Sequence, residues 1–330
     1  MNSKQLDSIP PTNPVNLTND LTLSPRINLL LSIYRSDTSV SPLDEWKLKN
    51  SLIDFLKSSF SYPINLPEED LLIRRFKDLK KRKREDPIAL CSIFIRDLGF
   101  VVSSAKKLKG SDDSEDELLE KKFLDWRNVL VEKMDGLEVN LEGVKFRVCA
   151  SLPVSDDFQL MKKNWEEFYA FGSGNYSRGT KKEPDTIILR GLPSRWFAET
   201  RVSSKPSMLV THTIFSTFGK IRNLNVAKDD DLGKDTNADD EDLISGLQCK
   251  VVVQFEQYKE FYNAMKVLCG RSLQKDGSRM KADYEVTWDK DGFFQSSWRH
   301  TQDNRNDGPR HRSYSSRYSP EDVRSKRYKE

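Results

Sequence analysis

The sequence of 330 residues contains no long hydrophobic run. A helix that crosses a membrane needs about 20 consecutive apolar residues, and the best stretch, residues 27–34, is far shorter and follows Arg26. The first residues also lack the basic region and the apolar segment of a secretory signal. We therefore expect no membrane contact and no export signal in this sequence.

Cysteine and histidine are scarce. The four cysteines are widely scattered and form no CxxC pair, which argues against a disulfide scaffold or a zinc knuckle and suits a reducing compartment. The sequence also lacks HExxH, P-loop, GxGxxG and GxSxG motifs. We therefore predict no metal, no cofactor, no small-molecule substrate and no enzymatic activity. Cys249 and His212 are most simply interpreted as residues of a core or a surface.

The sequence is poor in apolar residues and rich in charge. Hydrophobic residues make up 36% of the chain and charged residues 32%, so part of it is not expected to pack into a core. The 54 Lys and Arg residues nearly balance the 51 Asp and Glu residues, which leaves a net charge of +3. Any affinity for nucleic acid must therefore come from local patches and not from the charge of the whole molecule.

Composition and periodicity predict a leader and a first domain. Residues 1–23 are rich in Pro, Asn, Ser and Thr and are expected to be flexible. Ser41 and Pro42 suit the cap and the first turn of a helix. A small α+β domain is expected over residues 24–152. Its expected elements are the helix that begins near Ser41, a helix over 66–79, paired strands at 88–95 and 100–104, a helix over 119–134 and a strand over 144–150.

The second half of the chain has a more regular pattern. A helix and a linker are expected over residues 153–183, a second domain over 184–288, and a disordered tail with Arg and Ser over 289–330. The second domain reads as β-α-β-β-α-β. Its elements are expected at 186–192, 208–218, 221–226, 249–255, 258–268 and 282–288, with a long acidic loop at 229–242.

This order resembles the RNA recognition motif. Phe218-Gly219-Lys220-Ile221, between the first helix and the second strand, and Gly270-Arg271-Ser272-Leu273, after the second helix, are familiar junctions of that family. The expected fold class is therefore α+β. An atypical RNA recognition motif follows a second, smaller α+β domain, which is compatible with a divergent version of the same sandwich.

The sheet of the second domain lacks the usual aromatic residues. RNA recognition motifs stack bases on aromatic side chains of their first and third strands. Alternation along a strand directs one set of residues into the core: Ile187, Leu189, Val251, Val253 and Phe255. It leaves another set on the open face: Ile188, Arg190, Lys250, Val252 and Gln254. The stacking positions of the family fall on Ile188, Lys250 and Val252, and none of these is aromatic.

The missing aromatic residues predict weak RNA binding. A stacked base contributes about 1–3 kcal/mol, so losing several stacking platforms weakens binding by orders of magnitude. In the last strand, Tyr284, Val286 and Trp288 are expected to point inward, with Asp283, Glu285 and Thr287 outside. The two outer carboxylates would oppose phosphate. Arg190, Lys250 and, beside the sheet, Arg195 could still hold single-stranded RNA, or they are simply solvated.

A closer resemblance lies in residues 183–198, which read Glu-Pro-Asp-Thr-Ile-Ile-Leu-Arg-Gly-Leu-Pro-Ser-Arg-Trp-Phe-Ala. This segment is similar to the A-kinase anchor protein 17A family, also described as arginine/serine-rich splicing factor 17A. The similarity continues through 218–223 and from 246 to 273. The resemblance implies a nuclear, speckle-associated regulator of pre-mRNA splicing. Kinase anchoring in that family uses an amphipathic helix in a long charged C-terminal region, and we do not extend that function to this sequence, which ends at Glu330.

Three short motifs have two interpretations each. The basic run Lys80, Lys81, Arg82, Lys83 and Arg84 suits a nuclear localisation signal or a solvated helix end. Trp196-Phe197 could be an exposed anchor for a partner, but packing beneath the long connection after the first strand is favoured. Arg271 stands where protein-binding relatives carry Arg-x-Phe, although Leu273 replaces the Phe.

The leading hypothesis is a non-enzymatic nuclear adaptor that acts in pre-mRNA splicing. It would bind single-stranded RNA weakly, bind splicing-factor proteins, or both. The alternative is a protein-interaction module without direct RNA binding, either a scaffold of splicing factors or a kinase anchor. The candidate RNA-binding residues are Ile188, Arg190, Arg195, Lys250, Val252 and Gln254.

Overall fold

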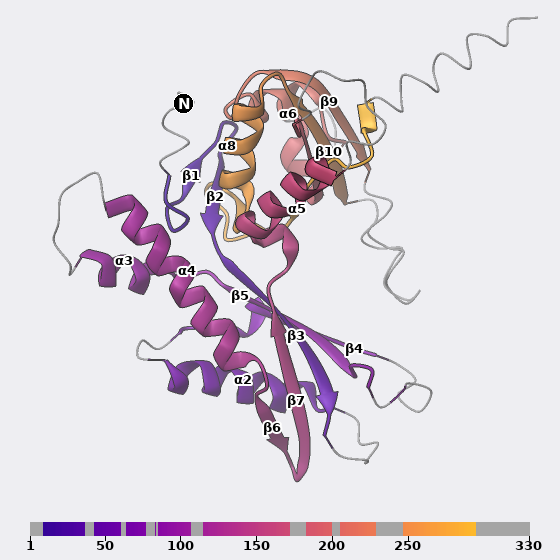
Figure 1. Cartoon of the computed structure of the whole chain (residues 1–330). Coiled ribbons are helices and arrows are strands. Elements are labelled where there is room, and N and C mark those ends of the chain that lie inside the picture. Colours follow the sequence, from indigo (N-terminus) through magenta and orange to yellow (C-terminus); the bar gives the residue numbers. More distant parts are fainter. Residues whose placement is uncertain are drawn as a thin grey trace, which may run out of the picture. The chain divides into compact units, whose positions relative to one another are not determined.

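The computed structural model describes residues 9–36, 43–60, 64–76, 83, 85–106, 115–171, 183–199, 205–228 and 247–294. Residues 1–289 form one unit and residues 290–330 another. Among the described helices, none is both long and apolar enough to cross a membrane. In its described residues, the first unit contains three sheets but two separate hydrophobic cores. We call the parts built around these cores the first module (core of β3, Ile27–Arg35, to β7, Val144–Ser151) and the second module (core of β8, Thr186–Pro193, to β13, Glu285–Trp288) (Figure 1).

The first module is built on an antiparallel sheet. Within the described part of the chain its strand order is β4-β5-β3-β7-β6. The strands are β3 (Ile27–Arg35), β4 (Leu71–Arg75), β5 (Ala89–Ile95), β6 (Glu138–Leu141) and β7 (Val144–Ser151). The helices are α2 (Glu45–Ser59), α3 (Gly99–Lys106) and α4 (Glu115–Met134). The helices α2 and α4 lie along one side of this sheet (Figure 1). Their apolar residues share one core with the inward residues of the sheet.

Two of the expected helices are confirmed, α2 and α4. Asp44 caps α2, because its carboxylate accepts a hydrogen bond from the Lys47 amide at 3.2 Å. The expected cap, Ser41, and Pro42 lie outside the described residues. The buried side of α2 consists of residues at helical spacing: Leu48, Leu52, Ile53 and Leu56.

Two expectations for the first module are wrong. The helix expected over 66–79 is not formed by residues 66–76, because a short 3-10 turn, η1 (Glu68–Asp70), leads directly into β4; residues 77–79 lie outside the described part of the chain. Leu71 is buried and Leu72 exposed, which is the alternation of a strand. Residues 100–104 lie in α3 and do not pair with β5. Both edges of β5 are already occupied, by β3 and by β4, so no edge remains for a hairpin partner.

The second module has the topology that its sequence predicts. Its sheet has the strand order β13-β8-β10-β9. Its strands are β8 (Thr186–Pro193), β9 (Ile221–Lys228), β10 (Gln248–Phe255) and β13 (Glu285–Trp288), and its helices are α6 (Met208–Phe215) and α8 (Tyr258–Leu268). A further helix, α5 (Phe158–Phe171), confirms the helix expected before the linker. The centroid of its Trp165 ring lies 5.4 Å from the centroid of the Phe261 ring in α8.

The inward residues of the second sheet are confirmed. Ile187, Leu189, Val251, Val253, Phe255, Tyr284, Val286 and Trp288 are all buried in its core. Both modules also share one arrangement. In each sheet, the first strand of the β-α-β-β-α-β order lies between the third and the fourth, and the second strand lies beside the third. The first module adds β6 beside its last strand.

The N-terminal segment belongs to the second module. The expected flexible leader is wrong for residues 9–23, because β1 (Val15–Asn16) and β2 (Leu21–Pro25) form a small sheet with β11 (Arg271–Lys275) and β12 (Lys281–Ala282). Leu21 and Leu23 are fully buried in the core of the second module. In the sequence, the alternation of Leu21 and Leu23 with polar residues is hidden by a composition rich in Pro, Asn, Ser and Thr.

Arg271 holds the first turn of this segment in place. Its guanidinium donates hydrogen bonds to the carbonyl oxygens of Val267 at 2.7 Å, Pro10 at 2.8 Å and Asn13 at 3.3 Å. Burial lowers the pKa of Arg271 to about 10. Because main-chain oxygens of the protein surround this guanidinium, Arg271 is not positioned as an exposed grip for a partner, as an Arg-x-Phe motif would require.

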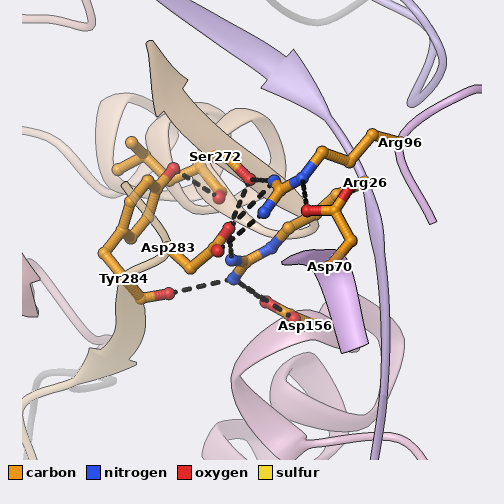
Figure 2. A network of polar contacts seen from close by, with 8 residues as sticks. Arg26, Asp70, Arg96, Asp156, Ser272, Asp283 and Tyr284 are labelled. Carbon is orange, nitrogen blue, oxygen red and sulfur yellow. Dashed lines mark hydrogen bonds and ion pairs between the residues drawn. The ribbon is translucent and has the colours of Figure 1, made fainter. Parts of the chain in front are cut away.

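The chain passes from the second module to the first at Arg26, between β2 and β3. The Arg26 side chain is only 2% exposed. It donates hydrogen bonds to both Asp156 oxygens, at 3.2 and 3.3 Å, to the Tyr284 carbonyl at 3.1 Å and to the Asp283 carboxylate (Figure 2). Arg26, the residue directly before the central strand of the first module, is therefore anchored in the second module.

Arg96, which follows β5, bonds to the same carboxylate from the first module. Its guanidinium donates to the two Asp283 oxygens at 3.1 and 2.8 Å, and to Asp70 at 2.7 Å (Figure 2). The Ser272 hydroxyl accepts a bond from Arg96 at 2.6 Å and donates one to Asp283 at 2.6 Å. The Phe94 ring lies 5.3 Å from the Arg26 guanidinium and 5.1 Å from that of Arg96.

We expect Leu23→Ala to destabilise the whole chain by about 2–5 kcal/mol, because it opens a cavity in the second core. Urea unfolding followed by tryptophan fluorescence measures this change. Leu209→Ala, at a side chain that is 69% exposed, is the matched control and should change the stability by less than about 0.5 kcal/mol. An unchanged midpoint for Leu23→Ala would contradict the assignment of β2 to this core.

We expect Asp283→Asn to lower the stability at pH 7 by about 1.5–3 kcal/mol, because charged hydrogen bonds to two arginines are lost. Burial alone would raise the pKa of Asp283, but hydrogen bonds from Arg96 and the charge of Arg26 lower it to about 2. The carboxylate therefore stabilises the fold above about pH 4, its unfolded value, and this contribution disappears as the pH falls towards 2.

Unfolding free energies of the native chain and of Asp283→Asn, measured from pH 7 to pH 2, test this linkage. The difference between the two proteins should be largest at pH 7 and should shrink below about pH 4. Glu256→Gln, at an exposed position, is the control at pH 7 and should change the stability by less than about 0.5 kcal/mol. A constant difference for Asp283→Asn would show that its charge does not stabilise the junction.

Candidate nucleic-acid interface

The face of the second sheet that points away from its core presents three rows of residues across β13, β8, β10 and β9. The first row is Thr287, Ile188, Val252 and Asn225. The second is Glu285, Arg190, Lys250 and Ala227. The third contains Gln254 and Asn223. Among these described residues none is aromatic, so the face has the composition that the sequence predicts.

Arg190 and Lys250 meet at an irregularity of the sheet. The register between β8 and β10 shifts so that Arg190 and Gly191 together face Lys250. Gly191 has a φ of 78°, a backbone conformation that favours glycine. Such a bulge keeps Leu192 in the core while it places two cationic side chains next to each other on the outer face.

Two of the expected open-face residues are buried. Val252 is 1% exposed and Gln254 is 9% exposed, so neither offers the open surface that we expected. Gln254 is held in a polar chain: its Oε1 accepts a bond from Asn223 at 2.6 Å, and its Nε2 donates one to Asp185 at 2.8 Å. Alternation predicts the side of the strand but not these partners, which come from another strand and from the segment before β8.

The carboxylates near this face have different environments. Asp283 is bonded to Arg26 and Arg96 and is not an outward-facing charge, which corrects the sequence-based expectation. Glu285 is exposed, and it lies directly opposite Arg190 in the register of β13 and β8. Ile188 and Lys250 are partly exposed. In the second row, the carboxylate that would repel an RNA phosphate is therefore that of Glu285.

The remaining expected site residues lie apart from these rows. Arg195 is exposed in the 3-10 helix η4 (Ser194–Phe197), directly after β8. Phe197 is buried against the second core and Trp196 packs partly against it, which confirms the favoured interpretation of this pair. The N-terminal segment contacts this turn, because Asn19 donates a hydrogen bond to the Trp196 carbonyl at 3.3 Å.

The basic run lies mostly outside the described residues, and only Lys83 belongs to the described part. The Lys83 amide donates a hydrogen bond to the Asp86 carboxylate at 3.1 Å. The Arg and Ser tail from residue 295 onward is also outside the described residues. The nuclear localisation signal therefore stays a prediction.

The structure places the two residues that the sequence analysis assigned to a core or a surface. Cys249 is fully buried in the second core and His212 is exposed on α6. In the part of the chain that the structure describes, His, Cys, Asp and Glu residues form no group that could hold a metal ion. The sequence alone does not single out Arg26, Arg96 and Asp156, since nothing in their local sequence indicates that they meet near Asp283.

Comparison with known proteins supports the assignment of the second module. A family model described as "AKAP-17A-like, RNA-binding domain" matches residues 119–320, more than half of the chain. The match begins in α4 of the first module and includes the complete second sheet. It confirms the resemblance seen at residues 183–198.

A curated relative is the A-kinase anchor protein 17A of Homo sapiens. It is 29% identical to this chain over 165 residues, which cover 47% of this chain and 24% of the relative. Most of the relative therefore has no counterpart in the match. The family is described by RNA binding and not by an enzymatic activity. On the match to more than half of its length, the chain belongs to the AKAP-17A-like RNA-binding domain family.

Proposed function

We propose that this protein binds single-stranded RNA weakly through the second module and acts as an adaptor in pre-mRNA splicing in the nucleus. The observation that carries the proposal is the pair Arg190 and Lys250 on the outer face of a module that matches an RNA-binding domain. Two adjacent cations can hold successive phosphates, or hydrogen-bond to the edges of unpaired bases. Arg195, exposed in η4 directly after β8, is a further cation of this module.

The chemistry of the face determines the kind of RNA binding. Bases cannot stack on Ile188 or Thr287 as they do on an aromatic ring, so affinity depends mainly on charge. Charge-driven binding is sensitive to salt and only slightly dependent on sequence. Glu285 lowers the net positive charge of the row that contains both cations. We therefore propose that partner proteins supply the specificity in a splicing assembly, as an adaptor would require.

The binding proposal is tested by titrating the full chain with a random single-stranded RNA pool over a series of salt concentrations. We expect Arg190→Ala and Lys250→Ala each to weaken binding about three- to thirtyfold and to reduce the steepness of the salt dependence by roughly one phosphate contact. Lys259→Ala, on α8 at the opposite side of the sheet, is the matched control. If all three variants bound the RNA pool as tightly as the native chain, this face would be ruled out as the RNA-binding site.

A gain-of-function variant tests the same face in the opposite direction. Ile188→Phe adds an aromatic ring at a partly exposed position in the middle of the face. Because one stacked base contributes about 1–3 kcal/mol, we expect this variant to bind the RNA pool about five- to a hundredfold more tightly. Ile188→Leu provides an aliphatic control of similar size. No gain for the aromatic variant would indicate that RNA does not lie across the sheet.

The cellular part of the proposal needs separate measurements. The tagged protein should be nuclear and concentrated in speckles, and its depletion should change splice-isoform ratios. The alternative, a protein-interaction module that does not touch RNA, is motivated by the burial of Val252 and the lack of aromatic residues in the described rows of the face. A stable protein complex that survives nuclease treatment, together with no RNA binding by the chain, would favour that alternative.

A further inference from the structure

The sheet of the first module has one face that is exposed over part of β3, β4 and β5. Its other face is buried against α2 and α4. Three leucines point away from that core and remain substantially exposed: Leu30 on β3 at 37%, Leu90 on β5 at 38% and Leu72 on β4 at 55%. Scattered exposed leucines are common on protein surfaces, but a group on neighbouring strands often marks an interaction site.

The strand register shows that the three leucines form one patch. Leu30 of β3 and Leu72 of β4 are both paired with Ser92 of β5, on opposite sides of it. Neighbouring strands are about 4.8 Å apart, so Leu30 and Leu72 are about 10 Å apart with a small side chain between them. Leu90, two residues from Ser92, is paired with Ser32. In this patch, large leucine side chains therefore alternate with small serine side chains.

Positive charge borders this patch. Arg74, two residues after Leu72, is exposed and is paired with Leu90. On the other side of β3, the exposed Arg147 of β7 is paired with Tyr34, and Lys145 lies on the same face. Glu138 of β6 is paired with Arg147 and supplies a single negative charge on this part of the face. The described border thus has an excess of positive charge next to an apolar centre.

We propose that this face, defined by Leu30, Leu72 and Leu90 with Arg74 and Arg147, binds an amphipathic helix of a partner protein that carries acidic residues beside its apolar side. Residues seven apart in a helix are about 10 Å apart along its axis, which matches the separation of Leu30 and Leu72. Apolar side chains of the helix fit over Ser92 and Ser32, and its acidic residues meet the arginines.

The composition favours a protein partner over RNA at this face. Leucine side chains give no flat surface on which a base can stack, and Tyr34 is the aromatic residue that the described part of β3 contributes beside them. Exposed apolar anchors near a positive border are instead typical of surfaces that bind amphipathic segments. This site is on a different sheet from Arg190 and Lys250, so the inference does not depend on RNA binding by the second module.

The test uses the full chain and random peptides of about 16 residues displayed on phage. Selection on the native chain, with counter-selection on Leu30→Asp/Leu72→Asp, should enrich peptides with leucine-type residues at helical spacing and with a net negative charge. We expect Leu72→Asp to weaken binding of a selected peptide at least about tenfold, as the loss of a central apolar anchor does. Leu209→Asp, at an exposed leucine of α6 in the second module, should leave binding unchanged.

A charge variant and a second ligand make the test decisive. Arg74→Gln/Arg147→Gln removes two exposed charges without placing a like charge opposite Glu138, and it should weaken binding about three- to thirtyfold. Enrichment of basic peptides, or no enrichment over the counter-selected chain, would overturn the proposal. It would also be overturned if Leu72→Asp left peptide binding intact but reduced binding of the random RNA pool, which would assign the face to RNA.

Discussion

The ion-pair network around Asp283 is the interaction on which the arrangement of the two modules depends. Arg26 reaches this carboxylate from the point where the chain leaves the second module, and Arg96 reaches it from the end of β5. A buried arginine must be paired, since its desolvation is costly without a counter-charge. Asp156 and Asp70 complete that pairing. The geometry therefore requires both modules to be folded and in contact.

This constraint explains why the N-terminal segment cannot be treated as a separate leader. β2 completes the small sheet beside β11, and the next residues enter the central strand of the first module. Arg271 fixes the preceding turn through main-chain oxygens of Pro10 and Asn13. One continuous segment thus contributes to both cores, which couples the stability of the second module to residues far away in the sequence.

The two open faces provide different chemistry in one unit. The face of the second module combines adjacent cations with an absence of aromatic residues among its described rows, which suits weak binding of RNA through its backbone. The face of the first module combines exposed leucines with a positive border, which suits an acidic amphipathic segment. If both proposals hold, one chain binds RNA and a protein partner through separate surfaces.

The sequence by itself determined the second module, because period-two alternation places residues such as Leu189 and Val251 inward without reference to the rest of the chain. It also determined α2 and α4 from apolar residues at helical spacing. Only the tertiary structure decided that residues 71–75 pair as a strand, since an edge of β5 was available to them. It alone brought Arg26 and Arg96 to Asp283, because no local pattern encodes a contact between residues so far apart in the chain.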